Sequence, residues 1–397
     1  MSLIDNHERT PKEKHPALKE YISKNRWPLI IAATAALVRI IYLLELSRLP
    51  DFVIPMVDEK WHWLWAKEIL EGPFFGDGAW FRAPLYPYFL ALLAKITGGS
   101  ILWSKILQAL LAGGTAFFTF KLADLLFNRT TAIVAGFIYA LYGTLVFYET
   151  SFLIPVLFLF FTVWGMYRLV AYSESRTFKS WLLTGVVFGL AIISRPNLLL
   201  VIPFLMLWFY YRRDSEQPRS QRLNFLLVLL LGIILSIAPV TMRNYIKTGD
   251  FIMISSQGGV NLYLGNNPIA DGLNMQMPEV NLDASVTWRQ FGTVVTSAAQ
   301  REAGRELSPA EESSFWTGKA VDFIAENPGG FVKLVWKKCV YLASGFENSD
   351  NADIYHQRTK STLYSLLVWN KLIYFPFGLL LPFALAGIVL ARGQSRR

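Results

Sequence analysis

The sequence predicts an all-α polytopic membrane protein: a bundle of about eight transmembrane helices with interfacial helices and a mixed outer loop domain. Composition is the first observation, because 53% of the 397 residues are hydrophobic and only 17% are charged. A soluble domain carries about 25% charged residues. The second is a series of apolar runs that approach the roughly 20 residues a helix needs to cross a bilayer. The third is that Lys and Arg gather near the ends of these runs.

Eight apolar segments are candidates for the spanning helices. They cover residues 27–46, 101–127, 132–148, 152–172, 181–194, 197–211, 223–242 and 362–391. The fifth and sixth are short and meet at Ser194-Arg195-Pro196, which also fits a helical hairpin that does not cross fully. Two further segments, 57–70 and 330–346, alternate apolar and charged residues at helical spacing, which is typical of helices lying in the membrane interface.

The distribution of basic residues gives one consistent orientation with both chain ends in the cytoplasm. Four regions follow from it: a cytoplasmic tail (1–26), a transmembrane core (27–242) that includes a first outer loop (47–100), an outer loop domain with an interfacial helix (243–361), and a last helix with a cytoplasmic tail (362–397). The net charge of +9 is explained by this topology and by contact with membrane lipid, so no nucleic-acid partner is expected. A single cysteine excludes an internal disulfide and a cysteine-based metal cluster.

The acidic pair Asp58-Glu59 is the first candidate for chemistry, because it follows the first span at the outer membrane face. One interpretation is a general base with a neighbouring acid that binds substrate or metal. The other is a solvated helix cap, a position that Asp favours. His62 lies one helical turn after Asp58, so the two could bind a divalent ion, although a histidine within an aromatic cluster is the simpler role.

Charged residues at the ends of other spans are the second group of candidates. Glu149 ends the third span at the depth expected for Asp58, and the alternative is an ordinary turn carboxylate. Arg195 and Arg243 break the positive-inside pattern, so each is expected to have an anionic partner, either a protein carboxylate or a ligand phosphate. Arg82 precedes a Pro-rich approach to the second span and suits capture of a phosphate. For Arg82 the alternative is an interfacial arginine in an aromatic belt. Arg39, inside the first span, needs a partner from another helix, either Glu149 or a lipid phosphate.

Polar segments in the outer loop domain are the third group of candidates. The Gly- and Asn-rich stretches Ser255-Ser256-Gln257-Gly258-Gly259-Val260-Asn261 and Gly265-Asn266-Asn267-Pro268 suit tight turns around a sugar or acceptor pocket. Neither matches a phosphate-loop pattern, so a nucleotide site is not expected. The run 347–353 could line the acceptor side or be a plain loop.

In their order along the chain, these motifs resemble a known family. The set comprises Asp58-Glu59, Arg82-Ala83-Pro84-Leu85-Tyr86, Glu149, Ser194-Arg195-Pro196-Asn197, Arg243-Asn244-Tyr245 and Gly265-Asn266-Asn267-Pro268. It is similar to the integral-membrane glycosyltransferases of the GT-C fold. The closest resemblance is to the family 39 group of bacterial protein O-mannosyltransferases and lipid A aminoarabinose transferases.

The resemblance implies transfer of a sugar, with inversion, from a polyprenyl-phosphate donor to a protein, lipid or glycan acceptor. By this likeness Asp58 is the base, Glu59 and Glu149 orient substrate, and Arg82, Arg195 and Arg243 hold the leaving phosphate. His62, Tyr86, Asn197, Asn244 and Asn266 are the remaining residues expected to contact substrate. No cofactor is implied beyond a possible divalent metal at Asp58 and His62. The expected location is a bacterial inner membrane, with the site facing the periplasm.

Two other functions remain open from the sequence. A transporter or flippase of lipid-linked glycans would carry charges within its spans and halves related by a repeat, whereas this chain gathers its unusual charges at one face and has no visible repeat. A non-catalytic scaffold for envelope-glycan assembly would not depend on Asp58.

Overall fold

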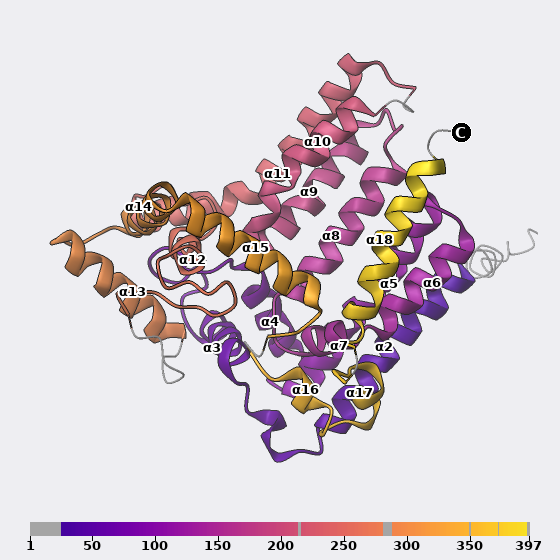
Figure 1. The fold of residues 1–397 in the computed structure, drawn as a ribbon, viewed down its shortest axis with the longest axis horizontal. Coiled ribbons are helices and arrows are strands. Elements are labelled where there is room, and N and C mark those ends of the chain that lie inside the picture. The colour runs from indigo at the N-terminus through magenta and orange to yellow at the C-terminus, as the bar shows by residue number, and fades with distance from the viewer. Residues whose placement is uncertain (1–24, 213–215, 281–287, 349–350, 372, 395–397) are drawn as a thin grey trace, which may run out of the picture.

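The computed structural model describes residues 25–212, 216–280, 288–348, 351–371 and 373–394, so the expected cytoplasmic tail lies almost entirely outside the described residues. Over these ranges the chain is helical and has isolated β-bridges but no strand, which confirms the all-α class (Figure 1). The outer region that was expected to be mixed is therefore helical in its described part. The first outer loop contains α3 (Val57–Glu71), as predicted, and also α4 (Leu85–Ile96), which the sequence analysis did not predict.

Most predicted spans correspond to apolar helices. These are α2 (Arg26–Leu46), α5 (Ile101–Leu126), α6 (Arg129–Leu141) with α7 (Gly143–Thr150), α8 (Pro155–Ala171), α9 (Phe178–Ser194), α10 (Ile202–Tyr211) and α11 (Arg219–Thr248). By length and composition α2, α5 and α11 are each sufficient to cross a membrane, and α6 with α7 makes a fourth if the bent pair is one span. The shorter apolar helices include α8, α9 and α10. The count of eight spans therefore stays a prediction.

Two predicted spans differ from the structure. The third is bent by 55° between α6 and α7, where Tyr142 adopts an extended backbone. The last was predicted to start at residue 362, but α17 (Thr362–Leu367) ends early and the apolar helix α18 begins at Phe377 (Phe377–Gln394). The reason is local: Pro376 has no N–H to donate and restricts Phe375, and the ring of Phe375 stacks on Trp369 at 3.8 Å across an isolated bridge.

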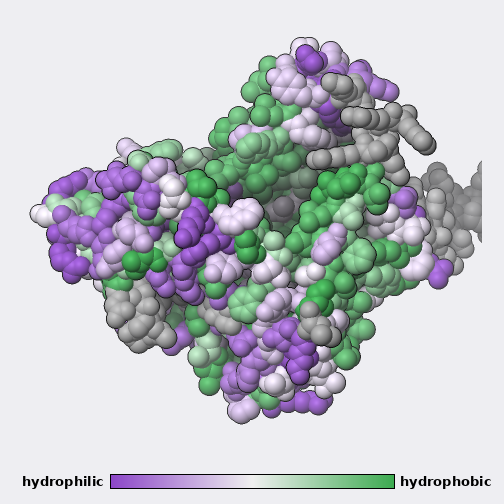
Figure 2. Space-filling view, in the orientation of Figure 1, coloured by the Kyte–Doolittle hydropathy of each residue, from purple (hydrophilic) through white to green (hydrophobic). Residues whose placement is uncertain are grey.

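Close backbone packing joins two of the apolar helices, α9 and α11. A Cβ at Gly185 of α9 would collide with the carbonyl of Leu229 on α11, and one at Gly232 of α11 would collide with the carbonyl of Leu182. In a membrane, burial of apolar surface contributes little to helix association, because lipid tails are as apolar as the helix surfaces. Small residues instead allow close backbone contact between the helices. Figure 2 shows apolar surface on the arm formed by α9–α11 and on α18, with a hollow between them.

The described part of the outer region contains α12 (Gly258–Gly265), α13 (Trp288–Ala303), α14 (Pro309–Glu326), α15 (Pro328–Ser344) and the short α16 (Ile354–Gln357). Helices α12, α13 and α14 pack around the buried ring of Trp316, which stacks on Tyr263 at 5.2 Å. A capping box of Ser308 and Glu311 starts α14. The predicted interfacial segment 330–346 corresponds to α15, whose Val332, Trp336 and Leu342 are 66%, 70% and 75% exposed. An apolar exposed face of this kind is what a helix lying in the interface requires.

Candidate active site

A cavity of about 670 Å³ lies where α3, α7, α8, the end of α9 and the outer region meet. Its polar lining residues are Asp58, His62, Arg82, Ser194, Arg195, Asn197, Gln257, Asn261, Glu347 and Asn351. Its apolar wall consists of residues such as Leu145, Leu153, Ile154, Pro155, Phe158 and Leu159. The volume lies in the range typical of small-ligand sites. The cavity brings together five of the eleven residues that the sequence predicted for the site.

Asp58 enters the cavity from the first turn of α3, at the end of a strained backbone. Val57, directly before it, has a φ of +47°, which is unfavourable for a β-branched residue. Strain of this kind costs about 1–3 kcal/mol and concentrates at functional sites. It sets the direction in which the chain presents Asp58.

The Asp58 carboxylate is held on both sides. Arg82 Nη1 donates to Asp58 Oδ1 at 2.9 Å, and the guanidinium also lies 4.9 Å from the ring centre of Trp61. On the other side Asn351 Nδ2 donates to Asp58 Oδ2 at 3.4 Å, while the backbone N–H of Asp58 donates to Asn351 Oδ1 at 3.2 Å. The carboxylate is therefore fixed between the first outer loop and the outer region.

Glu59 and His62 anchor the segment that connects α7 to α8. Glu59 accepts a hydrogen bond from the backbone N–H of Phe152 at 3.1 Å, and His62 Nδ1 donates to the Phe152 carbonyl at 2.8 Å. Lys105 binds the same Glu59 carboxylate at 3.2 Å. Glu59 lines a smaller cavity of about 150 Å³, and its observed contacts hold the backbone at Phe152 and pair with Lys105.

His62 presents its second ring nitrogen without a partner. Nε2 is buried and has no hydrogen-bond partner among the described residues, while the histidine lines the cavity. Burial, with a further contribution from the positive charge of Arg82, lowers the pKa of His62 to about 4. With Nδ1–H donating to Phe152, the neutral ring has Nε2 as a free acceptor for a hydroxyl group.

The Asp58–His62 pair is a poor fit for a divalent ion. Among the described residues no group of three or more His, Cys, Asp or Glu side chains could hold a metal. Arg82 already binds the Asp58 carboxylate, and its charge would oppose a second cation there. These residues give no basis for a metal-dependent step.

Arg195 lines the cavity from the end of α9, next to the 3₁₀ turn Pro196–Leu200 that also presents Asn197. Its guanidinium lies 6.0 Å from the ring centre of Phe158. No carboxylate within the described ranges forms an ion pair with it. Arg195 is therefore the cation in this cavity that is available for an anion.

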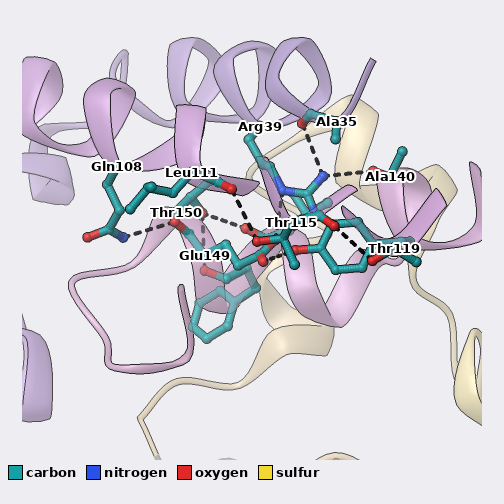
Figure 3. A network of polar contacts seen from close by, with 12 residues as sticks. Ala35, Arg39, Gln108, Leu111, Thr115, Thr119, Ala140, Glu149 and Thr150 are labelled. Atoms are coloured by element: carbon teal, nitrogen blue, oxygen red, sulfur yellow. Dashed lines mark hydrogen bonds and ion pairs between the residues drawn. The ribbon is translucent and has the colours of Figure 1, made fainter. Parts of the chain in front are cut away.

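Glu149 is not in the cavity but forms a buried ion pair with Arg39 (Figure 3). Both side chains are 0% exposed, and Arg39 Nη2 lies 2.6 Å from Glu149 Oε2. Arg39 Nη1 also donates to the carbonyl of Ala140 at 2.8 Å, next to the bend between α6 and α7, and Tyr139 donates to the second carboxylate oxygen. Of the two partners expected for Arg39, Glu149 or a lipid phosphate, the structure shows Glu149. The pair joins α2 to the bent span and satisfies a backbone group at the break.

Arg243 lies on α11 and holds a loop instead of facing the cavity. Its guanidinium donates to the carbonyls of Phe75 and Gly78 and lies 4.2 Å from the ring centre of Trp80. Asn244 next to it donates to the carbonyls of Ile252 and Ile254 at 3.1 Å. These contacts fix two outer connections. The Arg243 side chain therefore does not face the cavity, and the prediction that it contacts a phosphate directly does not fit this geometry.

Tyr86 and Asn266 also lie away from the cavity. Tyr86 is fully buried and donates to Gln108 Oε1 at 2.6 Å, and Gln108 in turn donates to the carbonyls of Glu149 and Ser151. Asn266 donates to the Leu262 carbonyl at 2.8 Å and accepts from Lys338. Both contribute to packing of the surrounding elements.

The structure adds cavity residues that were not predicted individually. Gln257 and Asn261 belong to the Gly- and Asn-rich run that was expected to shape a pocket, and Glu347 and Asn351 belong to the run that had been left between an acceptor wall and a loop. Their polarity was the available signal, but only the tertiary fold brings them to α3. Burial raises the pKa of the Glu347 carboxyl above its ordinary value.

Comparison with known proteins identifies one similar family. The family model described as dolichyl-phosphate-mannose-protein mannosyltransferase matches residues 81–242. The match supports a GT-C glycosyltransferase assignment of the family 39 type. Together with the apolar helices, it indicates a multi-pass membrane protein with glycosyltransferase activity in general. No curated protein matches the chain. The matched residues include Arg82 and Arg195 and begin after Asp58.

Proposed function

We propose that the protein transfers a sugar from a polyprenyl-phosphate donor to an acceptor hydroxyl at the outer face of a bacterial inner membrane. The observation that carries the proposal is the placement of the carboxylate of Asp58 and the free guanidinium of Arg195 in one cavity. A carboxylate can accept the proton of the attacking hydroxyl, and a guanidinium can bind the phosphate that departs.

In this mechanism the acceptor oxygen attacks the anomeric carbon from the side opposite the phosphate. The new C–O bond forms as the bond between the anomeric carbon and the phosphate oxygen breaks, which inverts the configuration. The acceptor proton passes to Asp58, and polyprenyl phosphate leaves with its growing negative charge facing Arg195. Fixed cations at the position where charge develops stabilise the transition state.

Other residues are proposed to position these two groups. Arg82 and Asn351 hold Asp58, while His62 fixes the neighbouring backbone through its bond to the Phe152 carbonyl. Asn197 lies beside Arg195 and is placed to donate to a phosphate or sugar oxygen. Glu59 and Arg243 act through the loops that they anchor, and Glu149 acts through the ion pair that joins α7 to α2. The apolar wall of α7 and α8 suits the first isoprene units of the donor.

The test is turnover by the purified protein in lipid nanodiscs that contain polyprenyl-phosphate mannose, with polyprenyl-phosphate arabinose in a parallel assay. Mannotriose and a serine-rich peptide supply the acceptor hydroxyls. Release of polyprenyl phosphate and a product of inverted anomeric configuration, read by NMR, would support the proposal. If the protein in vesicles moves the intact lipid-linked sugar across the bilayer and leaves its sugar–phosphate bond uncleaved, the transporter function replaces it.

A further inference from the structure

A second pair of cavities lies on the outer side of α3, apart from the cavity that contains Asp58. Their volumes are about 400 and 220 Å³, and they adjoin because Trp65, Glu68, Gly76 and Asp77 line both. One wall is α3 and the other is the loop from Gly72 to Phe81. Three tryptophans and three carboxylates face this space: Trp61, Trp65, Trp80, Glu68, Glu71 and Asp77.

The loop that closes these cavities is held in place by buried groups. Gly76 and Gly78 have φ values of +59° and +66°, which only glycine adopts readily, and Arg243 donates to the carbonyls on either side of Gly76 and Asp77. Asn244 Oδ1 accepts from the backbone N–H of Trp80 at 3.4 Å. A loop fixed by a nearly buried arginine presents its side chains in a preformed arrangement.

One aromatic ring and one guanidinium lie between these cavities and the active site. Trp61 lines the smaller of them, and the guanidinium of Arg82 lies 4.9 Å from its ring centre. The same guanidinium binds Asp58 at 2.9 Å. A molecule held against Trp61 is therefore separated from the proposed base by the ring and one arginine.

The chemistry of the lining favours a neutral, hydroxyl-rich ligand. Indole rings offer flat apolar faces, but the rings of Trp61 and Trp80 already engage the guanidinium groups of Arg82 and Arg243. Because each ring already interacts with a guanidinium group, its attraction for a second cation is weaker. Dispersion is then the main attraction between these rings and a ligand. Carboxylates accept hydrogen bonds and donate none, so Glu68 and Asp77 match hydroxyl groups.

We infer that these adjoining cavities bind the neutral glycan portion of an acceptor, with sugar rings stacked on Trp61, Trp65 and Trp80 and hydroxyls bonded to Glu68 and Asp77. This inference deepens the proposed function, because it makes a glycan the acceptor that Asp58 deprotonates. A basic peptide is the other ligand that aromatic rings and carboxylates attract, and the experiment separates the two.

The test measures binding without turnover, using saturation-transfer NMR on the full-length protein in detergent. The probes are mannotriose, maltotriose, cellotriose and chitotriose, with trilysine as the basic comparison. We expect at least one trisaccharide to bind the wild type, and at least fivefold weaker binding to Trp65→Ala and to Glu68→Gln. Trp103→Ala is the matched control, since Trp103 is 59% exposed on α5, far from these cavities in the chain and outside their lining.

Three outcomes would overturn the inference: no trisaccharide binds, both variants bind as the wild type does, or trilysine binds in place of the trisaccharides. Glu68→Gln changes an exposed side chain, so it tests the site even if Trp65→Ala folds poorly. Trisaccharide binding by a protein that cleaves no lipid-linked donor would leave this site standing and refute the proposed function alone.

Discussion

The Asp58 carboxylate accepts a hydrogen bond from the Arg82 guanidinium at 2.9 Å, with the two side chains 16% and 10% exposed. The contact joins the first turn of α3 to the residue that leads into α4. It gives Asp58 a fixed orientation, which a general base requires, because proton transfer depends on geometry as well as on acid strength. Arg82 thus supports the proposed base directly, a different role from the phosphate binding expected from its sequence position.

Replacing Asp58 by Asn should lower the rate of sugar transfer by about 10²–10⁴-fold, the range that a positioned base contributes. Asn keeps the shape of the side chain and a partner for Arg82 and Asn351, so the unfolding temperature should change little. The rate is measured as polyprenyl phosphate released by purified protein. Asp322→Asn on α14 makes the same chemical change at an exposed acid and should retain the full rate. Unchanged turnover in Asp58→Asn would remove Asp58 from the mechanism.

Replacing Arg195 by Ala should weaken binding of polyprenyl phosphate by about 10–100-fold, since a hydrogen bond to a charged group contributes about 1.5–3 kcal/mol. Arg195→Lys keeps the charge but lacks the planar guanidinium, so its affinity for polyprenyl phosphate should lie between those of the wild type and Arg195→Ala. Binding is followed by isothermal titration in nanodiscs, with the exposed Arg301→Ala as the control. Equal affinity in Arg195→Ala and wild type would show that the phosphate binds elsewhere.

The buried pair of Arg39 and Glu149 should behave as one structural unit. Glu149→Met leaves a buried guanidinium without its counter-charge and should destabilise the fold by about 3–5 kcal/mol, as should Arg39→Met. The double variant Arg39→Met/Glu149→Met removes both charges and should recover a large part of that loss. Thermal unfolding in detergent measures the three variants. Additive losses in the double variant would show that the two residues do not act through each other.

Close packing of α9 on α11 predicts a strong effect of a single methyl group. Gly185→Ala and Gly232→Ala each place a Cβ against the backbone of the other helix and should destabilise the protein by about 1–3 kcal/mol. Gly387→Ala on α18 is the matched control, because a Cβ there meets nothing within 4 Å. The readout is the unfolding temperature from size-exclusion chromatography after heating. An unchanged value for both α9–α11 variants would contradict this close approach.

The sequence predicted those helices whose signal lies within the segment itself. Apolar runs located α2, α5 and α11 to within a few residues except where α11 continues past Met242, and helical spacing located α3. The break at Tyr142 and the delayed start of α18 were missed, since hydropathy continues across both and the cause is turn geometry. The partner of Arg39 could be inferred because a charge within a span needs one.

For the site, the sequence identified individual candidate residues better than it identified the partners that they contact. Asp58 and Arg195 were recognised as exceptional for their place at a membrane face, and both line the cavity. Arg243 was exceptional by the same criterion, yet it holds a loop by bonds to Phe75 and Gly78, carbonyls that no sequence pattern marks. Asn351 could not be paired with Asp58 from sequence, because 292 residues separate them along the chain and only the fold brings them together.

The buried histidine predicts how stability depends on pH. The pKa of His62 is about 4 in the folded protein and ordinarily 6.5, so between these values the unfolded chain binds a proton that the folded chain excludes. The contribution of His62 to stability is therefore complete above pH 6.5 and is lost as the pH falls towards 4, with an upper bound of roughly 3 kcal/mol.

His62→Gln keeps a donor for the Phe152 carbonyl and cannot be protonated, so its unfolding temperature should fall less between pH 7 and pH 5 than that of the wild type. His356→Gln, at an exposed histidine on α16 (Ile354–Gln357), should follow the wild type. If wild type and His62→Gln lose stability in parallel on acidification, protonation of His62 does not couple to folding.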